Sequence, residues 1–166
     1  MRPDITPRAP AITLILGIGN SLLADDGVGL HVLRALGDDA QADPSLRLCD
    51  GGTVGLALLP EIENCTRLIV IDAVQMGAPS GTLHVFEDAA MDAQMHGSKR
   101  SAHEVALADL MGAAHLLGTV PSRRALVGVQ PGDIGWGLVP TPPVAAAIAP
   151  ACAAVRALIK GWSDGA

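Results

Sequence analysis

Short, wholly apolar runs that alternate with helical patterns constrain the fold of this chain more than any other feature. Residues 12–16 and 68–71 read as buried strands, and residues 46–49 as a further short strand. Runs that are apolar at every position are typical of parallel strands, because both faces of such a sheet are covered. Parallel strands need long crossover connections, which are usually helices. The pattern therefore favours an α/β protein.

Helical spacing occupies the connections between these runs. Apolar residues recur every three to four positions over residues 28–36 and 56–62, and a third helix is expected at residues 102–117. An Ala-rich final helix should run from about residue 143 to residue 160, and Pro150 should kink or split it. Residues 130–143 are rich in Gly and Pro and predict a loop.

Two more strands are expected, at residues 82–86 and 125–129. The link from Asp72 to Thr82 is too short for a parallel crossover, which favours an antiparallel fourth strand. Residues 87–100 are polar and suggest a mobile loop. The order β-α-β-α-β-β-α-β-α predicts a three-layer α/β/α fold around a mostly parallel sheet. We expect one domain over residues 11–162, after a flexible leader at residues 1–10.

Composition narrows the class of partner. Hydrophobic residues make up 49% of the 166 residues but aromatic residues only 2%, so the core must be aliphatic. A net charge of −6 argues against nucleic acid or an anionic membrane as the main partner.

The longest apolar stretch, residues 143–159, is short for a membrane span and contains Pro150 and Arg156. Three scattered cysteines predict no disulfide framework, so the expected location is the cytoplasm.

A Gly-rich loop after the first strand carries two adjacent carboxylates, Asp25 and Asp26, to the start of a helix. One of them is expected to cap the helix, because Asp is among the best N-caps, while the other faces the cleft. Two negative charges disfavour the phosphate that such a loop often binds. The dinucleotide fingerprint G-x-G-x-x-G also fails, because position 22 is Leu.

Asp72 and His103 are the other candidate site residues. Asp72 closes the apolar run at residues 68–71, at the strand end where α/β proteins bind ligands, although it could equally cap a turn or pair with Lys or Arg. Ser101 and Glu104 form a capping box, which places His103 in the first turn of a helix. The positive helix end should keep its ring neutral, the form that binds metals. The other histidines are interpreted as structural, with His31 on an exposed helix face: His31, His84, His96 and His115.

Two carboxylates and one imidazole suit a borderline divalent metal such as nickel, zinc, iron or manganese, with coordination positions left open for water or substrate. Spacing alone does not show that the three side chains meet. A nucleophilic mechanism has little support, because no cysteine has a nearby histidine and no G-x-S-x-G elbow occurs.

Several ordered motifs together resemble the hydrogenase maturation endopeptidases, which process the large subunit of nickel–iron hydrogenases. The resemblance runs from residue 12 to about residue 158. Its motifs are GIGNSLLADDGVG at 17–29, DGGT at 50–53, IDA at 71–73, SAHEV at 101–105, LADL at 107–110 and VGVQP at 127–131.

The resemblance implies a mixed five-stranded sheet with one antiparallel strand and helices on both faces. It implies that Asp26, Asp72 and His103 bind metal and act in catalysis; some family members carry Glu where this chain has Asp26, so ligand reach should differ. It also associates a second loop with substrate recognition, here Asp50, Gly51, Gly52 and Thr53, although a tight turn explains these glycines equally well.

The family's substrate is a folded, nickel-bearing precursor of the large subunit, from which a short C-terminal extension is removed. The resemblance thus implies that nickel comes with the substrate and is not permanently bound, and that the precursor is the partner of a chain we expect to be a monomer. Whether the nickel serves recognition or catalysis stays open, as does the general base. Two alternatives remain: a docking or chaperone protein for metallocentre assembly, and a nucleotide-binding module, which Asp25 and Asp26 disfavour.

Overall fold

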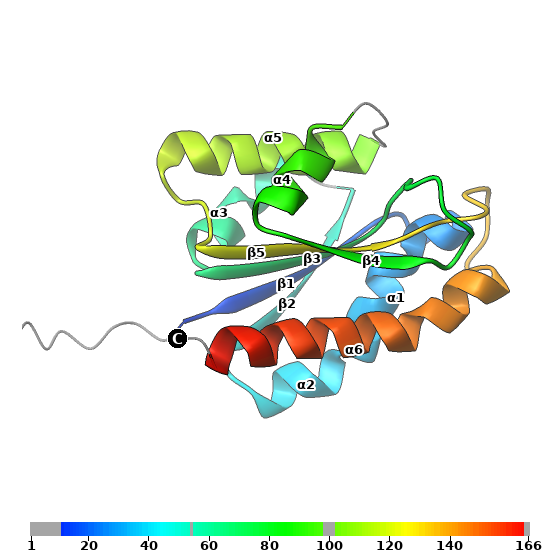
Figure 1. Cartoon of the computed structure of the whole chain (residues 1–166), viewed down its shortest axis with the longest axis horizontal. Coiled ribbons are helices and arrows are strands. Elements are labelled where there is room, and N and C mark those ends of the chain that lie inside the picture. The colour runs from blue at the N-terminus through cyan, green and yellow to red at the C-terminus, as the bar shows by residue number, and fades with distance from the viewer. Residues whose placement is uncertain (1–10, 54, 98–101, 165–166) are drawn as a thin grey trace, which may run out of the picture.

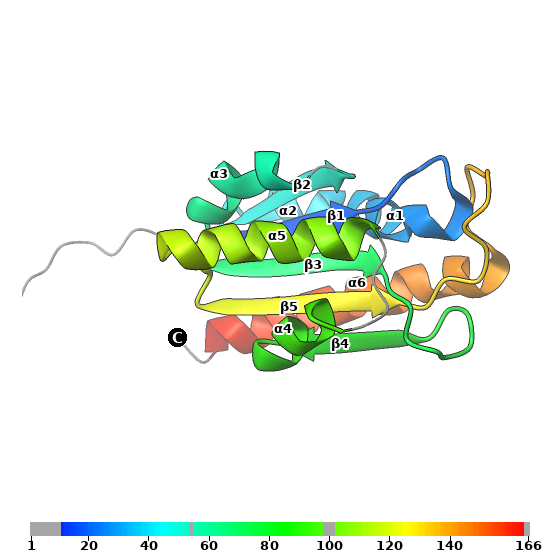
Figure 2. The same cartoon turned by 90° about the horizontal axis from the view of Figure 1, so that it is seen from above.

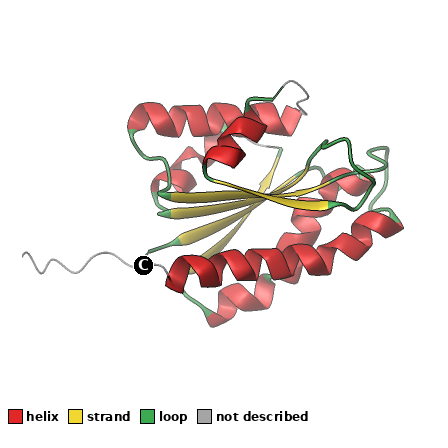
Figure 3. Cartoon of the chain, in the orientation of Figure 1, coloured by secondary structure: helices red, strands yellow, loops and turns green. Residues whose placement is uncertain are grey.

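A five-stranded mixed sheet forms the centre of the protein, with strand order β2-β1-β3-β5-β4. The computed structural model describes residues 11–53, 55–97 and 102–164. Strands β1, β2, β3 and β5 are parallel, and edge strand β4 runs antiparallel to β5, as the sequence predicts (Figure 3). The strands are β1 (Thr13–Ile18), β2 (Leu46–Gly52), β3 (Arg67–Ala73), β4 (Leu83–Glu87) and β5 (Arg123–Val129).

Helices cover both faces of this sheet, which gives the expected three layers (Figures 1 and 2). Helices α1 (Val28–Ala35) and α6 (Pro142–Asp164) lie on one face, with the short α2 (Gly37–Ala42) beside β2. The opposite face carries α3 (Leu59–Glu63), α4 (Ala89–Met95) and α5 (Ala102–Leu117). Two 3-10 turns, η1 (Ala24–Gly27) and η2 (Leu56–Leu58), precede α1 and α3.

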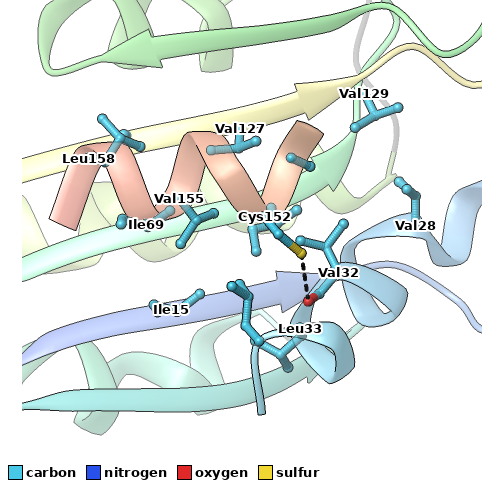
Figure 4. Close-up of a cluster of buried hydrophobic side chains, with 14 of the residues drawn as sticks. Ile15, Val28, Val32, Leu33, Ile69, Val127, Val129, Cys152, Val155 and Leu158 are labelled. Carbon is cyan, nitrogen blue, oxygen red and sulfur yellow. Dashed lines mark hydrogen bonds between the residues drawn. The ribbon is translucent and has the colours of Figure 1, made fainter. Parts of the chain in front are cut away.

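Each layer boundary holds its own apolar core. Between the sheet and helices α1 and α6, the buried side chains are mainly Val, Ile, Leu and Ala, as the low aromatic content predicts (Figure 4). Cys152 belongs to this core, where its Sγ lies 3.9 Å from the carbonyl oxygen of Val32. On the other face, Met91 and Met95 of α4 pack with Leu107 and Leu110 of α5. Both faces of the parallel strands are therefore covered.

Gly29 sets how closely α1 approaches the sheet. A Cβ atom at this position would collide with the carbonyl oxygens of both Ile18 and Ile71. Only glycine permits this contact, which brings the start of α1 against the carboxyl ends of β1 and β3. The turn η1, just before α1, is thereby held above the strand ends where a ligand site is expected.

The prediction of a mobile loop at residues 87–100 is wrong for most of that segment. Residues Ala89–Met95 form α4, whose Met91 and Met95 are buried. Asp92 on its outer side accepts a hydrogen bond from Nε of Arg124 at 2.9 Å. The four-residue spacing of the two methionines matches one turn of helix, which explains why this short segment packs down. Residues 98–100 of the expected loop, and the leader at residues 1–10, lie outside the described residues.

Helix α6 continues from Pro142 to Asp164 and is not split at Pro150. It starts and ends close to the expected positions. By length and hydropathy alone it could cross a membrane, which is weak support for a membrane role. One side of it, including Val144, Val155 and Trp162, is buried in the core beside α1 and β5. This is the packing of a core helix.

Candidate active site

Three elements bring the predicted site residues to the carboxyl end of the sheet. The loop after β1 and the turn η1 carry Asp25 and Asp26, β3 carries Asp72 near its end, and the first turn of α5 carries His103. Gly19 lets the loop fold back on itself, since it has a φ of +133° and a Cβ atom there would collide with the carbonyl oxygen of Asp26. The folding of these elements thus places the four residues at the same end of the sheet.

Asp26 and His103 are in direct contact. Nε2 of His103 lies 3.0 Å from Oδ2 of Asp26, which also accepts a hydrogen bond from the backbone amide of Asn20 at 2.9 Å. Their side chains are only 13% and 12% exposed. Burial acts to raise the pKa of the Asp26 carboxyl, but the hydrogen bond from His103, together with that from Asn20, holds it below its usual value. Asp26 is therefore ionised at neutral pH.

The same contact opposes the effect of the helix end, which was expected to keep His103 neutral. The hydrogen bond to Asp26 raises the pKa of the imidazole, against the opposing effect of burial, and the charges of Asp26 and Asp72 add to the increase. A carboxylate at 3.0 Å outweighs the partial charge of a helix end. The predicted capping box involves Ser101, which lies outside the described residues.

Asp72 is more deeply buried than Asp26, its neighbour in the site. It is 1% exposed, and its Oδ1 accepts a hydrogen bond from the amide of Ala73 at 2.8 Å. Its Oδ2 is buried and has no hydrogen-bond partner among the residues that the structure describes. Burial raises the pKa of this carboxyl to about 8, although the charge of His103 opposes the shift. An unsatisfied buried carboxylate oxygen is costly and is the kind of group that a bound cation would stabilise.

The three predicted ligands are only partly assembled. Asp26 and His103 touch, and Asp72 is close enough for its charge to affect the pKa of His103. Within the parts of the chain that the structure describes, no three His, Cys, Asp or Glu side chains are arranged to hold a metal ion. In this arrangement Nε2 of His103 and Oδ2 of Asp26 are bonded to each other, and a metal ion would need both atoms as ligands. A metal ion can therefore bind them only if this hydrogen bond breaks.

Asp25 does something that the sequence did not suggest. It caps neither η1 nor α1. Its fully buried carboxylate instead accepts four hydrogen bonds: from the amides of Gly132 and Asp133 at 2.8 and 2.9 Å, and from the amide and hydroxyl of Thr141 at 2.6 and 2.8 Å. Burial acts to raise the pKa of Asp25, but these hydrogen bonds hold it below its usual value. Asp25 thus anchors the loop after β5 to the loop after β1.

Gln130 fixes the other end of that loop after β5. Its side-chain oxygen accepts hydrogen bonds from the amides of Met76 and Ala78, and its nitrogen donates to the side chain of Gln75 at 2.9 Å. The sequence analysis notes Gln130 only within the VGVQP motif and gives neither Gln130 nor Thr141 a role, because each acts through partners more than 50 positions away. Only the position of Gln130 at a strand end could have drawn attention to it.

The predicted recognition motif forms a tight turn at the end of β2. Oδ1 of Asp50 accepts a hydrogen bond from the amide of Gly52 at 2.9 Å, and Gly52 has a φ of +47°. This explains Asp50 and Gly52 as turn residues. Thr53 lines a small pocket beside His103, together with Ile18, Gly55, Leu58, Ala106, Leu107 and Leu110. Of the motif, Thr53 is the residue placed next to the site, and a role in recognition stays a prediction.

The remaining histidines and the cysteines do not join this site. His31 is half-buried, not exposed as expected, and burial lowers the pKa of its ring. His84 packs against Phe86 on β4, with ring centroids 4.4 Å apart. Burial raises the pKa of the thiol in all three cysteines, to about 11 in Cys65, so none is activated as a nucleophile.

Comparison with known proteins agrees with this architecture. The family model described as HycI, hydrogenase maturation protease, matches residues 30–157. The hydrogenase expression/formation protein HupD of Rhodobacter capsulatus is 38% identical over 154 residues, which cover 92% of this chain and 73% of that protein. The hydrogenase 2 maturation protease of Escherichia coli is 35% identical over 149 residues, covering 89% of this chain and 90% of that one.

Solved structures extend the likeness to the fold. The hydrogenase maturating endopeptidase HybD from Escherichia coli superposes with a TM-score of 0.83 at 32% identity, covering 90% of this chain and 93% of that chain. The hydrogenase maturation protease HybD from Thermococcus kodakarensis superposes with a TM-score of 0.73 at 24% identity, which supports the fold alone. By its family match, its relatives and its fold, this chain belongs to the hydrogenase maturation protease family.

Proposed function

We propose that this chain is the endopeptidase that removes the C-terminal extension of a nickel-loaded precursor of a nickel–iron hydrogenase large subunit. Asp26, Asp72 and His103 engage the nickel that the precursor carries, so that only metal-loaded substrate is cut. Nickel is then part of the substrate. The proposed compartment is the cytoplasm, in line with three scattered cysteines that predict no disulfide framework.

One observation carries this proposal: two acids and an imidazole at the strand ends, with one acid left unsatisfied. Asp26 and His103 are in contact, and the buried Oδ2 of Asp72 has no hydrogen-bond partner. Carboxylate and imidazole donors suit Ni²⁺. A site that is incomplete by itself fits a metal that arrives with its own ligands from another protein, because the donors here do not have to complete the coordination shell.

Engaging the nickel requires a rearrangement at Asp26. The lone pair of the imidazole must be free, so His103 gives up its shared proton and its hydrogen bond to Asp26. The 2+ charge of the metal replaces that proton as the partner of the carboxylates. The same charge stabilises the ionised form of Asp72, whose burial otherwise favours the neutral acid.

Cleavage follows from holding the scissile peptide beside this group. A site carboxylate removes a proton from water, the resulting hydroxide adds to the peptide carbonyl carbon, and the C–N bond breaks. The proton passes to the leaving amine. The nickel anchors the peptide in a productive orientation, which is a large part of what a hydrolase must supply. The small pocket lined by Thr53 lies beside His103.

A mass measurement tests the proposal. The protein is incubated with nickel-loaded and with nickel-free precursor, and the mass of the precursor is followed over time. We expect loss of a C-terminal peptide from the nickel-loaded form alone. Equal cleavage of both forms would refute the role of nickel, and binding without any change in mass would refute the peptidase in favour of a docking or chaperone protein.

A further inference from the structure

An exposed apolar patch lies at the same end of the sheet as the candidate site. Among the described residues, nine large hydrophobic side chains are exposed, and five of these gather on two loops. Trp136 is 86% exposed, which is unusual for the residue that has most to gain from burial. We call these five side chains the apolar patch: Leu22 on the loop after β1, and Ile134, Trp136, Leu138 and Val139 on the loop after β5.

The two loops of the apolar patch are paired with each other. Leu23 and Gly137 form a parallel bridge, in which the amide of Ala24 donates to the Gly137 carbonyl at 2.8 Å and the Gly137 amide donates to the Leu22 carbonyl at 2.9 Å. This register puts Leu22 alongside Trp136. Figure 2 shows the two loops side by side beyond the strand ends. The exposed apolar residues therefore lie on two neighbouring loops that are joined by backbone hydrogen bonds.

The patch is held rigidly. The buried carboxylate of Asp25 binds the loop at Gly132, Asp133 and Thr141, on both sides of the exposed residues. Gln130 fixes the start of the same loop through the amides of Met76 and Ala78. A surface that is ordered in advance loses little conformational entropy on binding. Contiguous exposed apolar side chains, Trp above all, are typical of protein interaction sites.

The position of the patch identifies its occupant. Leu22 lies four residues before Asp26, and the amide of Asn20 donates directly to the Asp26 carboxylate at 2.9 Å. The patch therefore includes part of the loop that leads into Asp26 and that contacts the Asp26 carboxylate through Asn20. A bound partner that is not the substrate would obstruct cleavage. The net charge of −6 does not favour an anionic membrane instead.

We infer that the apolar patch is the docking surface for the substrate protein, and that it receives aliphatic or aromatic side chains of the precursor next to the segment that is cut. This inference rests on the proposed function, and adds to it a binding surface outside the metal-engaging residues. Docking here brings the precursor's nickel to Asp26 and His103 and contributes affinity that does not depend on the metal.

Kinetics of two matched variants test this docking. Trp136→Glu should raise KM for the nickel-loaded precursor at least about tenfold, the scale of a central interface tryptophan, with kcat unchanged at saturation. The control is Leu116→Glu, which alters a residue that is 88% exposed near the far end of α5, roughly 20 Å along the helix from His103. It should behave as the unaltered protein. Unchanged KM in Trp136→Glu, or a loss confined to kcat, would overturn the inference while leaving the peptidase standing.

A binding measurement separates failure of docking from failure of the proposed function. The chain has only two tryptophans, Trp136 and the 5%-exposed Trp162, so 5-fluorotryptophan gives one probe on the patch and one internal reference. Nickel-loaded precursor should shift the ¹⁹F resonance of Trp136 and leave that of Trp162 in place, whether or not it is cut. No shift at Trp136 overturns the inference, as does a shift that already arises from self-association of this chain and is lost on dilution.

Discussion

Nε2 of His103 lies 3.0 Å from Oδ2 of Asp26, although 77 positions separate the two residues in the sequence. This contact joins the start of α5 to the loop after β1. It holds the pKa of the carboxyl low and that of the imidazole high. Under the proposed function, the nickel of the precursor displaces the proton that these two side chains share.

Replacing His103 tests this site directly. His103→Ala should lower the rate of precursor cleavage at least about 100-fold, because it removes the imidazole donor at the reacting centre. The fold should persist, as the side chain lies at the edge of the core. His115→Ala is the matched control, because it alters an exposed histidine near the other end of α5. Full activity of His103→Ala, measured by precursor mass, would remove this residue from the site.

Asp72 should make the protein less stable as the pH rises. Its folded-state pKa is about 8, against 3.8 when unfolded, so between these values the folded state holds a proton that the unfolded state has lost. The contribution of this group to the free energy of unfolding is largest below about pH 4 and falls as the pH rises to about 8. The raised pKa of His103 should also lower the stability of the protein as the pH rises above 6.5.

Asp72→Asn should therefore flatten the fall in melting temperature between pH 5 and pH 8, since Asn cannot ionise. It should also stop cleavage. Thermal unfolding followed by circular dichroism at both pH values checks the slope. The same slope in Asp72→Asn and in the unaltered protein would show that Asp72 is not neutral in the folded state.

Asp25 should be needed for stability and for the order of the loop after β5. Asp25→Ala leaves the amides of Gly132, Asp133 and Thr141 without their carboxylate and should destabilise the protein by about 2–4 kcal/mol. This corresponds to a fall in melting temperature of about 5–15 °C. Limited proteolysis should then cut within residues 130–141.

The control for this variant is Asp133→Ala in the same loop, whose side chain accepts only a local hydrogen bond from Gly135. Its melting temperature should change by no more than about 3 °C. Equal effects of the two variants would contradict the anchoring role of Asp25.

Two glycine substitutions test the packing of α1. Gly29→Ala should destabilise the protein by more than about 3 kcal/mol or prevent folding, because the added Cβ collides with the carbonyls of Ile18 and Ile71. Gly37→Ala meets no atom within 4 Å and should be neutral or stabilising by up to about 1 kcal/mol. Denaturant unfolding of both variants provides the measurement. Similar stability of the two would show that α1 can move away from the sheet without loss.

The sequence predicted most of the fold because its central strands are continuous apolar runs and its main helices show helical spacing of apolar residues. Residues 102–117 were assigned to a helix whose observed bounds are Ala102–Leu117, and the short link after Asp72 correctly indicated an antiparallel β4. Helix α4 was missed because seven mostly small and polar residues give little periodicity. Its signal was the pair Met91 and Met95, whose burial depends on the facing side of α5.

The site was predicted in its residues but not in its contacts. Strand ends and a helix start indicated Asp26, Asp72 and His103, yet nothing in their spacing showed that Asp26 and His103 share a hydrogen bond. One of the two adjacent acids was expected to cap the helix, whereas Asp25 binds Thr141, which lies 116 positions away. Sequence patterns describe neighbours along the chain, and such long-range hydrogen bonds become visible only when the sheet brings the loops together.

The most direct test of the central claim is the coordination of the substrate's nickel. Nickel X-ray absorption is recorded on the precursor alone and on its mixture with the protein, frozen before cleavage proceeds. We predict that an imidazole nitrogen joins the nickel shell in the mixture, that His103→Ala abolishes this change, and that His115→Ala preserves it. A nickel shell that is the same with and without the protein, while cleavage continues, would contradict the account.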